Sequence, residues 1–272
     1  MDELTNEWMD EVMKTARLVW GYLRHNLMSA MAYRGAFFLQ AFGMLLNDAM
    51  LLFFWWVLFD RLPTLRGWDL AGVMTLYGIV AFGFGAATVV CGNGFLVARV
   101  IASGDMDYYL ALPADPLVHL LVSRMSLPGW GDLVFGLVVF LVAAPGRWVS
   151  LPLFLLLGLI AGLVLVAFSV LVGSLAFWVG NADNLATQAI NAIITFGLYP
   201  VEIFPGVVQV LLYTLIPAAF VGSVPAALLS DFHWGRMATL VGFTAGITLA
   251  ARCVFQRGLR RYESGNLVTV RG

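Results

Sequence analysis

Charge is scarce in this 272-residue chain, which has 15 basic and 16 acidic side chains, and hydrophobic residues make up 61% of it. So little polar surface cannot cover a soluble globule of this size. The single lysine, Lys14, has no GxxxxGK[ST] motif around it, which excludes a P-loop nucleotide site. HExxH, CxxC and GxSxG motifs are also missing, and the three histidines, His25, His119 and His233, lie far apart. We therefore expect neither a catalytic centre nor a metal site.

Two further absences narrow the function. The sequence has no basic-aromatic patch, which disfavours a nucleic-acid partner. Its two cysteines, Cys91 and Cys253, both lie in apolar runs without the spacing of a disulfide or metal pair, so we expect small buried side chains there. The acidic N-terminus has no short apolar core and does not resemble a cleaved signal peptide.

Long apolar runs are what the sequence has in abundance. Four of them approach or exceed the roughly 20 residues with which a helix crosses a bilayer: 37–59, 70–98, 151–179 and 237–255. They lack the polar stripe, repeating every three to four positions, of a soluble core helix. These runs predict an all-α, multi-pass membrane protein.

Turns and prolines divide the chain further. We expect six spans, at about 35–59, 70–98, 129–144, 151–179, 185–202 and 237–255. Four prolines punctuate the apolar stretch after the fifth span: Pro200, Pro205, Pro217 and Pro225. Proline ends or kinks helices, and broken backbone must be shielded from lipid, so residues 203–229 are expected to form short re-entrant helices.

The distribution of basic residues predicts which side of the membrane each segment occupies. Eleven of the 15 Lys and Arg residues lie in the N-terminal region, in 99–126 or near the C-terminus. The positive-inside rule places these regions in the cytoplasm and the chain in the inner (cytoplasmic) membrane. The expected organisation is a cytoplasmic N-terminal helix (1–34), a six-span domain (35–256) with a cytoplasmic segment (99–126), and a cytoplasmic tail (257–272).

Residues 3–34 show helical spacing without the apolar length of a span. Apolar side chains recur every three or four positions, and basic residues such as Arg17 and Arg24 mark another face. This pattern is typical of a helix lying in the membrane interface. A solvated helix that packs on a soluble partner is the alternative.

Polar residues in or near the spans are the first candidates for function. They are Asn47, Asp48, Asp132, Gln188, Asn191 and Glu202. For Asp48 and Asp132 we favour neutralisation of a nearby arginine or a helix cap, the cap being suited to Asp132 after Pro-Gly-Trp-Gly. Gln188, Asn191 and Glu202 are weaker candidates for substrate contact.

Two residue types have a structural and a functional interpretation. Glycines at 83–87 and Gly158, Gly162 and Gly173 favour close helix packing, with a glycine-lined conduit as the alternative. The aromatic residues Phe53, Phe54, Trp55, Trp56 and Phe59 suit anchoring at the membrane interface, with stacking on a hydrophobic cargo as the alternative.

Three segments resemble the permease subunits of type-2 ATP-binding-cassette (ABC) exporters, in the six-span branch whose cargo is uncharacterised. Residues 104–110 (GDMDYYL), Leu112-Pro113 and Asp115-Pro116-Leu117 resemble a cytoplasmic signature of the type Gly-x-Leu-Asp-x-x-Leu leading to Pro-x-x-Pro-Leu. Residues 199–204 (YPVEIF) with Ile216-Pro217 and Pro225-Ala226 resemble the broken outer segment, and 257–265 (RGLRRYESG) the C-terminal ending. One departure is Met106, where Leu or Ile is commoner.

The resemblance implies a permease that works beside a second copy or a paralogue and docks on a dimer of cytoplasmic ATPases. ATP and Mg would be bound by the ATPase, and this chain would hold no cofactor. The residues expected to couple to the ATPase, called the coupling set below, are Arg99, Gly104, Asp105, Asp107, Tyr108 and Pro113. Gly104, Asp105 and Pro113 would set a turn and cap a short helix.

Closure of the two ATPases would tilt spans one, two and five, and span five would line the cavity that holds the cargo. The residues expected along its route, called the pathway set below, are Phe53, Trp56, Gln188, Asn191, Tyr199 and Glu202. A hydrophobic or amphipathic cargo (a drug, lipid, peptide or lipid-linked glycan) suits these apolar spans, and membrane lipids surround them. Two other classes remain open: an ion-coupled secondary transporter, which would need internal repeats and acidic sites at the membrane midplane, and a membrane-embedded enzyme acting on lipid.

Overall fold

The computed structural model describes residues 2–143, 148–180 and 182–262, and regular structure over these ranges is helical apart from one β-bridge between Leu65 and Trp68. The α-helices are α1 (Asp2–Ala32), α2 (Arg34–Arg61), α3 (Leu70–Cys91), α4 (Val97–Ser103), α5 (Met106–Leu110), α6 (Pro116–Val122), α7 (Gly129–Ala143), α8 (Leu151–Gly173), α9 (Ala176–Val179), α10 (Asp183–Gly197), α11 (Val207–Thr214), α12 (Ser223–Ser230) and α13 (Trp234–Leu259). Short 3₁₀ helices join them: η1 (Gly92–Leu96), η2 (Trp148–Ser150), η3 (Val201–Ile203) and η4 (Ala218–Phe220).

Four helical stretches are long and apolar enough to cross a membrane: α2, the α3–α4 stretch Leu70–Ser103, the α8–α9 stretch Leu151–Val179, and α13. A bent pair formed by 207–214 and 218–230, with 65° between its parts, makes a fifth candidate. The predicted all-α membrane protein is confirmed. The predicted count of six spans stays a prediction, because α7 and α10 have only 15 residues each.

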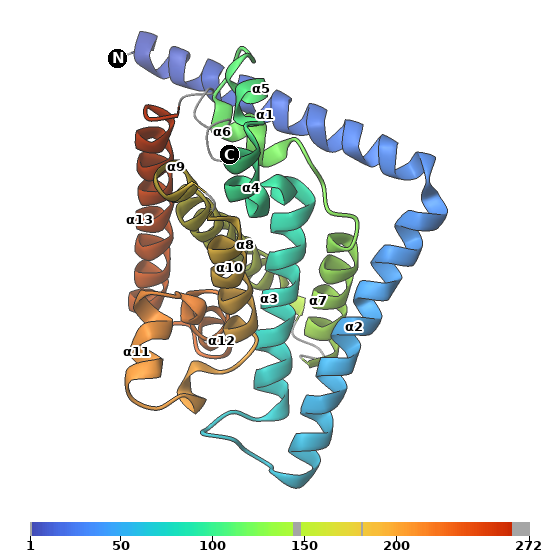
Figure 1. The fold of residues 1–272 in the computed structure, drawn as a ribbon. Coiled ribbons are helices and arrows are strands. Elements are labelled where there is room, and N and C mark those ends of the chain that lie inside the picture. Colours follow the sequence, from blue (N-terminus) through green and yellow to red (C-terminus); the bar gives the residue numbers. More distant parts are fainter. Residues whose placement is uncertain (1, 144–147, 181, 263–272) are drawn as a thin grey trace.

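The helices form one bundle, and the long helix α1 lies across one end of it (Figure 1). We call α1 the lid helix and this end the lid end. Helix α3 runs through the bundle and packs chiefly against α7 and α8, while α13 packs against α8. Helix α1 lies across the end that also holds α4, α5 and α6 (Figure 1). The end of the described chain reaches the same region, since the Tyr262 hydroxyl donates to the Gly104 carbonyl at 3.0 Å. The first and last described residues therefore lie at one end of the bundle.

Glycines allow the central helices to approach one another closely. A Cβ placed on Gly83 of α3 would lie 2.6 Å from the Gly158 carbonyl oxygen of α8. One on Gly136 of α7 would lie 2.5 Å from the Gly78 carbonyl oxygen of α3. Real side chains do not approach backbone so closely, so α3 meets both neighbours with no space for a methyl group. The packing interpretation of these glycines is confirmed.

The proline-punctuated stretch after α10 is broken as predicted. The Val201 amide donates to the Ser223 hydroxyl at 2.8 Å, so the chain returns close to the point where it left the bundle. Between these points lie the bent α11 and η4, and Leu212 and Val221 are buried there. Protein atoms thus cover part of the broken backbone, which is the condition for its presence at membrane depth.

Residues 123–128, between α6 and α7, have no helical structure and run along α3. The Ser126 amide donates to the Thr88 carbonyl of α3 at 3.0 Å. Helix α1 covers this segment, because Ala30 and Leu27 belong to one apolar cluster with Met125 and Leu127. The segment is therefore held between the lid helix and the bundle.

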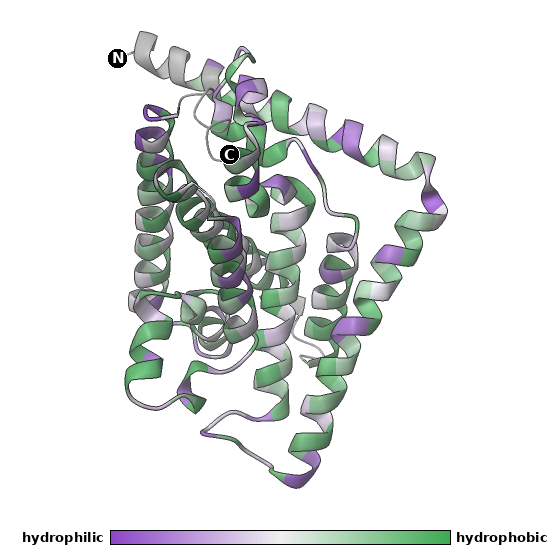
Figure 2. Cartoon of the chain, in the orientation of Figure 1, coloured by the Kyte–Doolittle hydropathy of each residue, from purple (hydrophilic) through white to green (hydrophobic). Residues whose placement is uncertain are grey.

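The prediction for the cysteines was wrong in part. Both thiols are free, but Cys253 is exposed on α13 and Cys91 is only partly buried. Helix α13 lies at the edge of the bundle (Figure 2), and only 28% of its most apolar 18-residue stretch is buried, so an apolar position on it faces lipid as readily as protein. In a membrane helix, apolar surroundings in the sequence do not imply burial within the protein.

Candidate functional site

Helix α5 forms a small projection at the lid end of the bundle. Gly104 ends α4 with φ +83°, a left-handed conformation that glycine adopts without strain, and this turns the chain into α5. Met106 and Tyr109 are buried beneath α5, whereas Asp105, Asp107 and Pro113 are exposed. Tyr108 is exposed over 63% of its surface. Five members of the coupling set, all except Arg99, thus lie together on this projection.

The capping predicted for Asp105 differs in the structure. Asp105 occupies the N-cap position of α5 but makes no side-chain bond to its backbone, and instead accepts from the Ser103 hydroxyl at 2.7 Å. Asp115 is the residue that caps, because its Oδ1 accepts from the amides of Leu117 at 2.8 Å and Val118 at 3.4 Å at the start of α6. The predicted turn at Gly104 is confirmed, while a different aspartate provides the cap.

A buried hydrogen-bond network joins the projection to the break in the second span. Asn93, in η1 between α3 and α4, is 5% exposed. Its amide nitrogen donates to the Tyr109 hydroxyl and to the Ser123 hydroxyl, both at 3.0 Å, and these two hydroxyls lie 3.1 Å apart. The three side chains come from η1, α5 and the end of α6. Because each has partners within the group, the network fixes the projection against α3 and α4.

Other contacts brace the same region. Arg252 of α13 forms an ion pair with Asp115 at 3.2 Å, and Tyr22 of α1 lies 3.1 Å from the His119 Nδ1 of α6. Burial, and then the nearby Asp107 carboxylate, raise the pKa of Tyr262 to about 12. The Tyr262 hydroxyl therefore stays protonated at neutral pH, which its donation to Gly104 requires.

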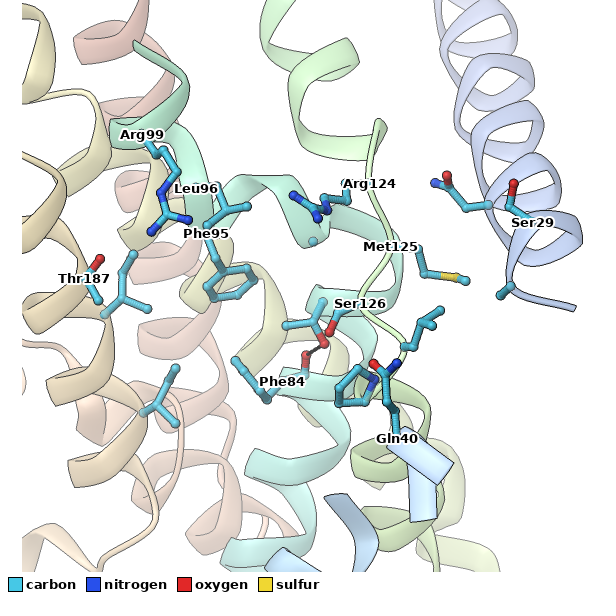
Figure 3. A pocket seen from close by; sticks show the side chains of 18 of the residues that line it. Ser29, Gln40, Phe84, Phe95, Leu96, Arg99, Arg124, Met125, Ser126 and Thr187 are labelled. Atoms are coloured by element: carbon cyan, nitrogen blue, oxygen red, sulfur yellow. Dashed lines mark hydrogen bonds between the residues drawn. The ribbon is translucent and has the colours of Figure 1, made fainter. Parts of the chain in front are cut away.

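Arg99 lies apart from the rest of the coupling set. It is on α4, where its Nε is 3.3 Å from the Asp183 carboxylate at the start of α10. It also lines a cavity of about 760 Å³ that is bounded by α1, α2, α3, α10 and the 123–128 segment. Figure 3 shows Arg99 and Thr187 on one wall and Gln40 and Ser29 on the other. The cavity therefore lies beside the first, second and fifth predicted spans.

The structure separates the members of the pathway set. Asn191 lines the 760 Å³ cavity, and Gln188 is exposed on the same helix, α10. Tyr199 packs against Trp55 with ring centroids 5.5 Å apart, and Glu202 accepts from the Trp68 indole at 2.9 Å. Phe53 and Trp56 project outward from α2, with 62% and 56% of their surfaces exposed. Of these six residues, Asn191 alone contributes to the large cavity.

The aromatic residues of α2 divide between two environments. Trp55 is 2% exposed and stacks on Phe59, with ring centroids 5.9 Å apart. Phe53 and Phe54 point outward with more than half of their surfaces exposed. Anchoring at the interface fits the outward residues, while Trp55 and Phe59 are part of the core.

The prediction for Asp48 and Asp132 was wrong. Asp48 lies in the middle of α2 and Asp132 inside the first turn of α7, and neither belongs to an ion pair between described residues. Both side chains line one pocket, and the Tyr77 hydroxyl of α3 donates to the Asp48 Oδ1 at 3.2 Å. Tyr77 is not among the candidates that the sequence predicts. The available signal was the absence of any Lys or Arg within the predicted first three spans.

Neither the Asp48–Asp132 pair nor any described histidine belongs to a group of three or more metal-binding side chains. Among the described residues, no three His, Cys, Asp or Glu side chains are grouped closely enough to hold a metal ion. His119 is buried, and its Nδ1 faces Tyr22. The geometry is that of a membrane bundle with a large cavity near α1 and a braced projection.

Comparison with known proteins agrees with this architecture. The chain matches no curated protein and no solved structure. The family model described as "ABC-2 family transporter protein" matches residues 45–265, which include most of the bundle and the α5 projection. A match over that much of the chain establishes a multi-pass ABC permease, and the chain belongs to the ABC-2 family of transporter proteins.

Proposed function

We propose that this permease is the membrane subunit of an ATP-driven exporter that moves a hydrophobic or amphipathic cargo out of the cytoplasm. A separate ABC ATPase binds ATP and Mg and docks on the α5 projection. The observation that carries the proposal is the Asn93 network, which links an exposed projection to a break in a membrane span. A projection that served only as a surface loop would need no buried connection of this kind.

The charges favour a cytoplasmic position for the projection. Helices α4 to α6, the start of α1 and the end of α13 share one end of the bundle (Figure 1). The Lys and Arg residues of this end outnumber those of the other, as expected for the cytoplasmic side of an inner-membrane protein. Helix α1 exposes Trp20 and Met28 next to Arg24, which supports its position along the membrane surface.

The closing movement of the ATPase would be transmitted to the cavity through two contacts, Tyr109 with Asn93 and Arg99 with Asp183. Movement of α5 shifts Tyr109, and Tyr109 pulls on Asn93 at the junction of α3 and α4. Helix α4 in turn holds α10 through the Arg99–Asp183 ion pair. Since α3 and α10 both line the 760 Å³ cavity, a displacement of α4 changes its width. The cavity would thereby open alternately to the two sides of the membrane.

Helix α10 supports the presence of a second permease subunit. Asn184, Gln188, Asn191 and Thr195 recur at three- or four-residue spacing and are all exposed. Polar side chains facing lipid are costly, so this face needs a protein or aqueous neighbour. A second copy or a paralogue, with the shared cavity between the two chains, meets this need.

The docking proposal is tested by purifying the tagged permease from its native organism and measuring the ATPase that accompanies it. Asp105→Arg and Tyr108→Asp should abolish co-purification while leaving the permease folded, because both side chains are exposed. Asp60→Arg, an exposed charge reversal at the opposite end of the bundle, is the matched control and should leave the complex intact. An unchanged complex with both α5 variants would refute docking at this projection.

An ion-coupled secondary transporter is the second candidate, and one observation favours it. Asp48 and Asp132 form a buried acidic pair within the spans, a feature of ion-coupled carriers. Proton or sodium uptake by vesicles that contain the permease alone, with no nucleotide and no ATPase, would support this candidate. Transport that needs both the ATPase and ATP would exclude it.

A further inference from the structure

The 760 Å³ cavity carries positive charge that its own lining does not balance. Two of the residues that line it are basic, Arg99 of α4 and Arg124 of the 123–128 segment, and none of the described lining residues is Asp or Glu. Both arginines are exposed, so a ligand can reach them from outside the bundle. The volume falls within the range of about 300–1,000 Å³ that is common for small-molecule sites. The cavity therefore has the size, the access and the charge to receive an anion.

Much of the hydrogen-bonding capacity of the two guanidinium groups is unused. Each guanidinium has five N–H donors. Arg99 uses its Nε to contact Asp183 at 3.3 Å, and its two terminal nitrogens make no hydrogen bond to a described residue. Arg124 belongs to none of the ion pairs between described residues. The two arginines and the single carboxylate of Asp183 leave one positive charge, which suits a ligand with one negative charge.

The backbone holds Arg124 at the edge of the cavity. A Cβ placed on Gly92 of η1 would lie 2.8 Å from the Arg124 carbonyl oxygen, so the irregular segment packs directly on η1 at this glycine. Two residues further on, the Ser126 amide donates to the Thr88 carbonyl at 3.0 Å. In Figure 3 the Arg124 side chain extends from this segment in the direction of Arg99. The site is thus built on backbone that is fixed against α3 and η1.

The lining of the cavity changes from charged to apolar along α10. This helix begins at Asp183, beside Arg99, and Ile190 and Ile194 line the cavity further along it. At 1.5 Å per residue they lie about 10 and 16 Å from that end of the helix. Figure 3 shows Phe84 below the arginines, at the same apolar end. The other polar side chains of the lining are uncharged. A ligand with an anionic head and an apolar body matches this order.

The charged end of the cavity also lies at a suitable depth for a headgroup. Asn26 and Ser29, in the last turns of α1, line the cavity together with the two arginines. Because α1 is proposed to lie along the membrane surface, the arginines are at the level of the lipid headgroups and the apolar end is at the level of the acyl chains. Basic pockets between membrane helices are typical sites for phospholipid headgroups.

Phosphate is the anion that these side chains suit best. The planar fork of a guanidinium donates two parallel hydrogen bonds to phosphate oxygens, and a phosphodiester carries the single negative charge that the site balances. We propose that the cavity binds the phosphodiester of a lipid-like amphiphile at Arg99 and Arg124, with the apolar part of that molecule along Ile190 and Ile194. Binding needs no ATP, so the proposal goes beyond the export function and does not rest on it.

The test measures binding to the purified full-length permease in a nonionic detergent, without nucleotide. The probes are dioctanoylphosphatidylglycerol, dioctanoylglycerol (the same chains without phosphate) and inorganic phosphate (no chains). The wild type should bind the phospholipid at least about 10-fold more tightly than either other probe, because only the phospholipid contacts both ends of the cavity. Equal binding of the two diacyl probes would overturn the proposal. Inorganic phosphate that binds as tightly as the phospholipid would also overturn it, in favour of a soluble phosphate ligand.

Variants then locate the site. Arg124→Gln should lose about 10- to 100-fold in affinity for the phospholipid and little for dioctanoylglycerol, and Arg124→Lys, which keeps the charge, should lose less. Arg99→Gln should lose a similar factor, but it also removes the ion pair with Asp183, so Arg124 decides if the Arg99 variant does not fold. Arg257→Gln removes the same charge from an exposed position near the end of α13, outside the cavity, and should bind as the wild type does.

The outcomes separate this site from the export function. Unchanged phospholipid affinity in a folded Arg124→Gln variant, or an equal loss in Arg257→Gln, would overturn the site. Loss of affinity in Arg124→Gln while the permease still co-purifies with its ATPase supports the site and the export function together. Selective phospholipid binding by a permease that recruits no ATPase supports the site and counts against the export function.

Discussion

Tyr109→Phe is the sharpest test of the connection between the projection and the spans. The substitution removes one hydroxyl and leaves the ring in its buried position beneath α5, where Tyr109 is 9% exposed. Two hydrogen bonds disappear, one from the Asn93 amide at 3.0 Å and one shared with the Ser123 hydroxyl at 3.1 Å. At about 0.5–1.5 kcal/mol each, their loss should cost about 1–3 kcal/mol of stability. For a chain of this size, this corresponds to a fall in Tm of roughly 2–12 °C.

The neighbouring residue offers a matched control. Tyr108→Phe removes the same hydroxyl from a side chain that is 63% exposed, and it should change stability by less than about 0.5 kcal/mol. Thermal unfolding of the two purified variants in one detergent measures the difference. In complex with the ATPase, Tyr109→Phe should also transport less cargo per ATP hydrolysed. Identical melting of the two variants would show that the network does not hold α5, and unchanged coupling would remove it from the proposed path.

Two further predictions concern packing and pH. Gly83→Ala places a methyl group 2.6 Å from the Gly158 carbonyl oxygen and should lower the free energy of unfolding by about 1–3 kcal/mol. Gly242→Ala on α13, which has nothing within 4 Å, should be neutral or stabilising in the same thermal unfolding assay. Equal effects of the two variants would refute the close α3–α8 contact. The pKa of Tyr262 is raised from 10.0 to about 12, so its contribution should be fully present below about pH 10 and disappear as the pH rises through about 12. The difference in Tm between the wild type and Tyr262→Phe should shrink over that interval, and a difference independent of pH would contradict this assignment.

Much of the fold could be predicted from the sequence because lipid imposes a simple rule. A helix must be apolar over the thickness of the bilayer, and α2, α3, α8 and α13 were located by run length alone. Helix α10 was harder to locate, because its polar stripe lowers its mean hydropathy and the following prolines obscure its end. The glycines of α3 and α8 were interpreted correctly, since close helix approach is their usual role in membranes.

The candidate sites could be predicted only in part, because they depend on contacts across the bundle. The coupling residues from Gly104 to Pro113 are close together in the sequence, so a short motif places them on one projection, and their role in coupling stays a prediction. Asp48 and Asp132 are 84 positions apart in the sequence, and their proximity is created by the packing of α2 against α7. The three partners in the Asn93 network are likewise drawn from separate helices, so no local pattern identifies them.

The irregular segment 123–128 has a consequence for the lid helix. Its peptide groups cannot all be paired in a helical ladder, and they border the apolar part of the bundle, where unsatisfied groups would meet hydrocarbon. By packing on Met125 and Leu127, α1 shields the peptide groups of this segment from lipid acyl chains. If α1 were removed, lipid would reach the segment between α6 and α7, so the loss of stability would begin inside the bundle and not at the N-terminus itself.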